Sequence, residues 1–61
     1  MDVITKFARD LIRYGKIINI KDRKKADDYY RTYHIVSEKG SFYKIVMRNG
    51  NVISLKRNKG Y

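Results

Sequence analysis

His34 carries the side chain best suited to acid–base chemistry, because the ordinary pKa of imidazole lies near neutral pH. A catalytic base also needs an orienting partner and a nucleophile. Ser37, Ser41 and Asp28 supply suitable groups, but no spacing typical of a triad. The chain has no cysteine, so thiolate catalysis and disulfides are excluded. We therefore interpret His34 as a packed or surface residue and expect neither enzyme activity nor a cofactor.

Three aspartates in one short segment provide the oxygen ligands that Ca²⁺ prefers. Their spacing matches no calcium loop, and four cations lie in the same segment. Turn, cap and ion-pair roles therefore explain the acids better than a metal site. The aspartates are Asp22, Asp27 and Asp28, and the cations are Lys21, Arg23, Lys24 and Lys25.

Positive charge is the strongest feature of the sequence. The 61 residues include 15 Lys and Arg against 6 Asp and Glu, a net charge of +9, and no acid follows Glu38. Such a charge attracts polyanions, and neutralised phosphates release counterions, which adds affinity without sequence specificity. Nucleic acid, either DNA or RNA, is the expected partner. The alternative is a lysine-rich surface that only maintains solubility.

Six tyrosines add an aromatic component to the basic region. Tyrosines among cations can stack unpaired bases beside phosphate contacts, although tyrosine also fills half-buried positions in small sheets. The predicted contacts are Lys44, Arg48, Lys56, Arg57, Lys59, Tyr30, Tyr33 and Tyr43. About five phosphate contacts on duplex DNA would give a log-log salt slope of roughly −4.5. No established nucleic-acid-binding motif occurs, so the kind of nucleic acid stays open.

An amphipathic pattern predicts a helix over residues 2–14. Its apolar residues repeat at helical spacing from Val3 to Ile12, Asp2 stands at the N-cap position, and Gly15 is expected to end the helix in a left-handed conformation. The same helix with basic residues on its outer side could lie on an anionic membrane, but the sheet needs its apolar stripe. Packing on a sheet is therefore expected.

The rest of the chain predicts strands. We expect a short strand over 16–20, a charged connector over 21–28 and a strand over 29–37, although tyrosine spacing in the last segment also fits a helix. Two further strands, 42–48 and 51–57, flank Asn49-Gly50, a strong signal for a type I′ hairpin. Another turn is expected over 38–41.

These elements predict one α+β domain over residues 1–61, with the helix on an antiparallel meander of three or four strands. The Asn-Gly turn pairs Val46 with Ile53, which leaves both sheet faces half apolar. Either the sheet curls into a small barrel or its second face contacts a partner. The length of the loop before Phe42 decides on which face Tyr30 and His34 lie. A two-residue loop places them on the same face as Tyr43. A three-residue loop with a glycine bulge places them on the opposite face.

The sequence contains no apolar run long enough to span a membrane and no secretory signal, so we expect a cytoplasmic protein without membrane association. A second hypothesis is a small module that binds an acidic protein surface, or a second copy of itself, through a sheet face or edge. The composition would suit an accessory protein of a phage or mobile element that inhibits or recruits a larger protein.

Overall fold

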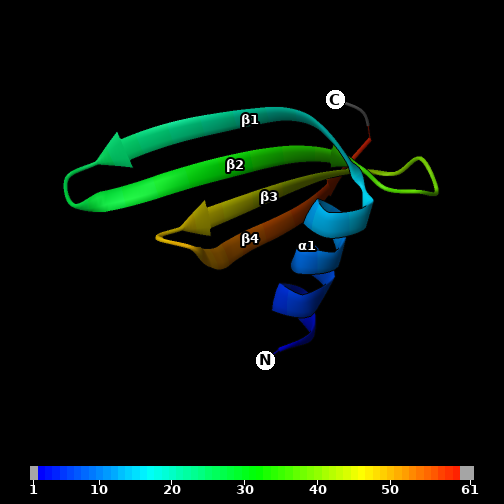
Figure 1. The fold of residues 1–61 in the computed structure, drawn as a ribbon, viewed down its shortest axis with the longest axis horizontal. Helices are drawn as coiled ribbons and strands as arrows, with labels where there is room; N and C mark the ends of the chain where they lie inside the picture. The colour runs from blue at the N-terminus through cyan, green and yellow to red at the C-terminus, as the bar shows by residue number, and fades with distance from the viewer. Residues whose placement is uncertain (1, 60–61) are drawn as a thin grey trace.

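The computed structural model describes residues 2–59, which form one helix and four strands (Figure 1). Each strand pairs with its neighbour in the chain in antiparallel orientation, in the order β1-β2-β3-β4. The predicted α+β class is confirmed, and the sheet is open rather than closed into a barrel. The elements are α1 (Val3–Tyr14), β1 (Lys16–Lys25), β2 (Asp28–Val36), β3 (Phe42–Arg48) and β4 (Asn51–Asn58).

Helix α1 forms as its sequence predicts. The carboxylate of Asp2 accepts a hydrogen bond of 2.6 Å from the backbone N–H of Thr5, which satisfies a free donor of the first turn. This hydrogen bond lowers the pKa of Asp2. With 12 residues, α1, the one helix within residues 2–59, is too short to span a bilayer.

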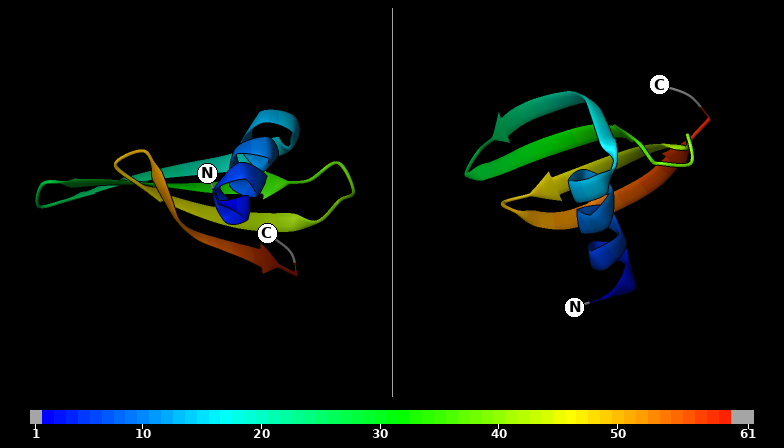
Figure 2. Two further views of the ribbon diagram at one scale, coloured as in Figure 1. Left: turned by 90° about the horizontal axis from the view of Figure 1, so that it is seen from below. Right: turned by 45° about the vertical axis from the view of Figure 1, so that its right-hand side comes forward.

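The core lies between α1 and one face of the sheet. Ala8 and Leu11 of the helix are buried with Ile35 and Ile45 of the two central strands. The ring of Phe7 meets the ring of Tyr43 edge to face, with centroids 5.5 Å apart. Figure 2 (left) shows the helix on one side of the sheet, and no described element covers the other side.

Gly15 ends the helix by a different route from the one predicted. Its φ is −78°, so the chain continues directly into β1 in extended conformation instead of turning through a left-handed residue. Its N–H donates to the carbonyl of Leu11 at 2.8 Å. A Cβ at this position would lie 2.6 Å from that carbonyl and 2.7 Å from Cγ2 of Ile35. Glycine is therefore required by close packing rather than by backbone conformation.

Gly15→Ala is expected to lower the free energy of unfolding by about 1–3 kcal/mol, because the added methyl group forces the helix end away from the sheet. Urea titration followed by circular dichroism measures this change. Gly40→Asn separates crowding from backbone strain, since a Cβ there meets no atom within 4 Å. Its expected cost is the strain of an L side chain at φ +85°, a region that asparagine adopts more readily than most residues. Equal stability of Gly15→Ala and wild type would show that the helix end adjusts without cost.

The β1–β2 hairpin is longer than predicted. Strand β1 continues through residues 21–25, which the prediction assigned to a connector, and the chain turns at Ala26, with φ +54°, and Asp27. Charged composition suggested a loop, but β1 is an edge strand whose side chains reach water, so charge does not prevent pairing. Strand β2 confirms the predicted strand over 29–37 and excludes the helical alternative.

The β3–β4 hairpin confirms the predicted turn, with positive φ at Asn49 and Gly50. The expected pair of Val46 with Ile53 is wrong, because Val46 pairs with Ser54 and Ile53 is an extra residue in a β-bulge. A bulge shifts the alternation of all later side chains. Leu55 therefore joins the helix-covered face and packs against the core, while Lys56 moves to the other face beside Lys44.

The loop over residues 37–41 fixes the register that the sequence left open. Val36 pairs with Phe42, and His34 with Lys44. Tyr30 and His34 therefore lie on the face opposite Tyr43. Gly40, with φ +85°, donates its N–H to the carbonyl of Ser37 at 2.9 Å and closes the predicted turn.

Candidate functional site

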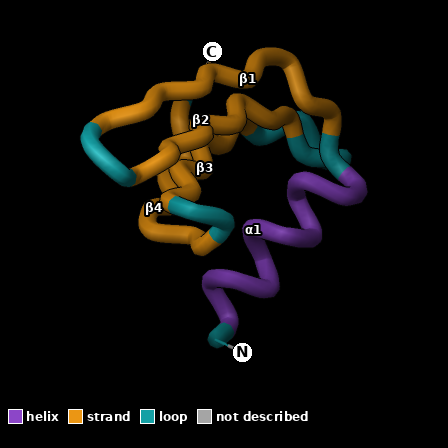
Figure 3. Tube along the Cα trace, turned by 60° about the vertical axis from the view of Figure 1, so that its left-hand side comes forward, coloured by secondary structure: helices purple, strands orange, loops and turns teal. Residues whose placement is uncertain are grey.

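The sheet face opposite α1, called here the open face, is the candidate site. Ile35 and Ile45 point toward the helix, so residues on either side of them in β2 and β3 point away from it. Figure 3 shows the helix lying along one side of the strands. Pairing and alternation place on the open face Lys16, Asn19, Lys21, Arg23, Lys25, Asp28, Tyr30, Thr32, His34, Val36, Phe42, Lys44, Val46, Arg48, Asn51, Ser54, Lys56 and Asn58.

Positive charge is concentrated on the open face. Seven of the 15 cations lie there with one of the six acids, so this face holds most of the net charge of +9. The single acid, Asp28, stands at the hairpin turn and accepts a hydrogen bond from the amide of Asn49 at 3.0 Å. The cations are Lys16, Lys21, Arg23 and Lys25 of β1, Lys44 and Arg48 of β3, and Lys56 of β4.

Lys44 and Lys56 are direct cross-strand partners on the open face. Like charges in this position destabilise a sheet, because their Cβ atoms stand only about 5 Å apart. Within residues 2–59, no ion pair joins an open-face cation to a carboxylate. The ion pair that these residues do form, Asp22–Arg31, lies on the helix-covered face. Among the described residues, Asp28, the partner of Lys25, is the one acid of the open face. The other cations therefore repel one another with little compensation, and a bound anion would relieve that repulsion.

Aromatic and uncharged side chains run along the middle of the open face. On β2, Tyr30 lies between Arg23 of β1 and Arg48 of β3. Tyr30 and Val46 line a shallow hollow of about 250 Å³ with Arg23 and Lys25. A half-buried ring with a guanidinium on each side offers a stacking surface next to phosphate-binding groups.

His34 occupies the same row, beside Asn19 of β1 and Lys44 of β3. Partial burial lowers the pKa of His34, and the charges of Lys21 and Lys44 lower it further. The imidazole is therefore neutral near pH 7 and adds no charge of its own. A flat, neutral ring among cations is suited to stacking.

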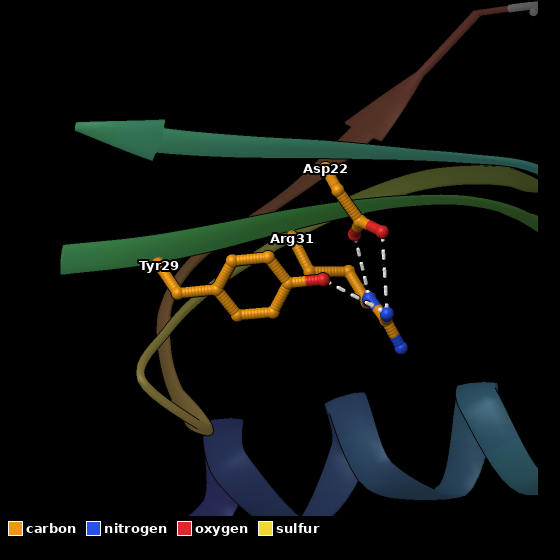
Figure 4. Close-up of polar contacts among 3 residues, drawn as sticks. All are labelled: Asp22, Tyr29 and Arg31. Atoms are coloured by element: carbon orange, nitrogen blue, oxygen red, sulfur yellow. Dashed lines mark hydrogen bonds and ion pairs between the residues drawn. The ribbon is translucent and has the colours of Figure 1, made fainter.

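On the helix-covered face, Arg31 of β2 forms an ion pair with Asp22 of β1. Nε of Arg31 donates to Asp22 at 2.7 Å, and a terminal nitrogen of Arg31 donates to the hydroxyl of Tyr29 at 2.9 Å (Figure 4). The hydrogen bond from Arg31 lowers the pKa of Asp22, and Asp22 raises the pKa of Arg31. This ion pair joins β1 to β2 on the helix-covered face and involves no cation of the open face.

The structure brings together four of the eight predicted contact residues. Lys59 follows β4 as an exposed residue beyond the sheet. The four that share the open face are Tyr30, Lys44, Arg48 and Lys56.

Three predicted contacts lie on the helix-covered face instead. Tyr33 and Tyr43 pack against the core, and Tyr43 also contacts Phe7. Arg57 pairs with Tyr43 after the bulge and donates to the hydroxyl of Ser41 at 3.2 Å. Loop length and the bulge decided these positions, and neither follows from residue type.

The prediction missed the cations of β1. Lys21, Arg23 and Lys25 alternate with Asp22 and Lys24, and this two-residue period places them all on the open face once β1 is a strand. That alternation was the available signal, but the segment was interpreted as a connector.

Comparisons of the chain with protein-family models, curated proteins and solved structures find no match. Any function assigned to the open face therefore rests on its geometry and charge.

Proposed function

We propose that this chain is a small, non-enzymatic nucleic-acid-binding module whose contact surface is the open face. The observation that supports this most strongly is the row of cations on β1 together with Lys44, Arg48 and Lys56 on the same uncovered face. Nucleic acids are linear polyanions, and a flat basic surface can contact several of their phosphates at once.

The alternative of a solvated surface explains the open face less well. A surface that only maintains solubility gains most from mixed charges, and it gains nothing from like charges placed directly opposite each other. Lys44 and Lys56 have that arrangement. A binding surface explains the unfavourable pair, because phosphate neutralisation removes the repulsion.

Nucleic-acid affinity is expected to fall steeply with salt. Seven phosphate contacts would give a log-log slope of about −5 on a single strand and about −6 on a duplex. Between about 50 and 200 mM salt, these slopes correspond to losses of about 1,000-fold and about 4,000-fold. Fluorescence anisotropy with labelled DNA and RNA oligonucleotides measures this slope. The circular dichroism spectrum at each salt concentration confirms that the fold is unchanged.

Polyglutamate of matched length serves as the control polyanion, because it carries negative charge without phosphates or bases. Weaker binding to polyglutamate than to nucleic acid is expected. Equal affinity for the two would contradict the proposal and favour an acidic protein as the partner. Absence of binding to every oligonucleotide at about 50 mM salt would overturn it outright.

A further inference from the structure

We propose that the open face holds an unpaired nucleic-acid strand, with bases stacked on the rings of Tyr30, His34 and Phe42 and phosphates on the flanking cations. This inference rests on the proposed function and assigns the kind of nucleic acid that the surface selects. It is carried by an uncharged row on β2, which includes Tyr30 and His34 and lies between rows on β1 and β3 that carry cations.

The row on β2 has no charge between Tyr30 and Val36, a distance of about 20 Å for six residues. Cations stand in the neighbouring rows, with Lys21 and Arg23 on β1, and Lys44 and Arg48 on β3. Neighbouring strands are about 4.8 Å apart. Each ring of the central row therefore has a positive charge within reach of a phosphate attached to a base stacked on that ring.

Phe42, on β3, adds a third ring at the other end of the face. It is the partner of Val36, and it lies diagonal to His34, about 7–8 Å away. Lys16 pairs with Val36 on the other side. Rings therefore stand at both ends and in the middle of one continuous surface.

A duplex would use only part of this surface. Its bases are stacked on one another, so its outer surface presents phosphates and sugars to the protein. Those groups suit the cation rows, but they would leave the central row of Tyr30, Thr32 and Val36 without matching contacts. An unpaired strand exposes base faces as well as phosphates and matches both kinds of row.

Anisotropy titrations would compare an unpaired oligonucleotide of about ten nucleotides, as DNA and as RNA, with the corresponding duplex. The unpaired strand is expected to bind at least about 10-fold more tightly. Tyr30→Ala and Phe42→Leu are each expected to weaken that binding about 10-fold and to leave duplex affinity nearly unchanged. Tyr30→Phe restores most of what Tyr30→Ala loses, because it keeps the ring.

Tyr29→Ala is the matched control, because Tyr29 neighbours Tyr30 in the chain but lies on the opposite face beside Arg31. It is expected to bind as wild type does, and circular dichroism checks the fold of each variant. Duplex binding as tight as single-strand binding, or no effect of Tyr30→Ala, would overturn this inference and leave the proposed function standing. Failure of both probes at about 50 mM salt would overturn the proposed function itself.

Discussion

Reversing three charges on the open face, with Lys21→Glu, Lys44→Glu and Lys56→Glu combined, is expected to weaken nucleic-acid binding at least about 100-fold at about 50 mM salt. The variant loses three phosphate contacts and adds three repulsive charges to the surface. The salt slope is expected to become shallower by about 2 on a single strand. Because the two glutamates introduced on β3 and β4 would again be like charges opposite each other, the cost of that pair to the fold stays similar.

A second triple variant separates the position of the charges from their number. Lys6→Glu, Arg9→Glu and Lys24→Glu lower the net charge from +9 to +3, as the first triple does, but these residues lie on α1 or on the helix-covered face. This control is expected to lose less than about 5-fold in affinity, through the weaker long-range field alone. Equal losses in the two variants would show that net charge, rather than the open face, determines binding.

Ile45→Ala is expected to unfold most of the protein at 25 °C. Ile45 is fully buried between α1 and the sheet, and such truncations cost about 2–5 kcal/mol. A chain of 61 residues without disulfides has only about 3–5 kcal/mol of stability in total. Far-ultraviolet circular dichroism and urea titration measure the loss directly.

Ile53→Ala removes the same atoms from the bulge of β4, where the side chain is 53% exposed. Its expected effect is within about 0.5 kcal/mol, as for most exposed substitutions. A cooperative melt of Ile45→Ala close to that of wild type would show that the four buried residues do not form the stabilising core.

The sequence predicted correctly the helix and the β3–β4 turn, which are determined by residues close together in the chain. Helix α1 follows from its apolar spacing and the Asp2 cap, and the β3–β4 turn follows from Asn49-Gly50, because neighbours in the chain determine both structures. The extension of β1 was missed because its charged residues become strand only through pairing with β2, a contact between distant residues. The strand propensity of individual residues contains no information about such long-range pairing.

Only four of the eight predicted contact residues lie on the open face, and the reason is related. The excess of cations is visible in composition, but the face of each cation depends on counting residues through every loop and bulge. One extra residue, Ile53, moved Lys56 onto the open face and Arg57 off it. A five-residue loop placed Tyr30 there and left Tyr33 with the core. Sheet positions alternate, so an error of one residue reverses the assignment of everything after it.

Strand β1 carries a bulge like that of β4, because its register with β2 shifts between Ile17 and Asn19, and the two bulges affect how copies of this protein behave when crowded. An open sheet has two edges, and each edge strand carries one bulged isoleucine, Ile18 in β1 and Ile53 in β4. A bulge interrupts the regular row of backbone groups with which a strand from another copy would pair. Several copies on one polyanion would lose the mutual repulsion that keeps them apart in solution. The irregular edges remain after the charge is neutralised, and they oppose growth of a continuous sheet from copy to copy.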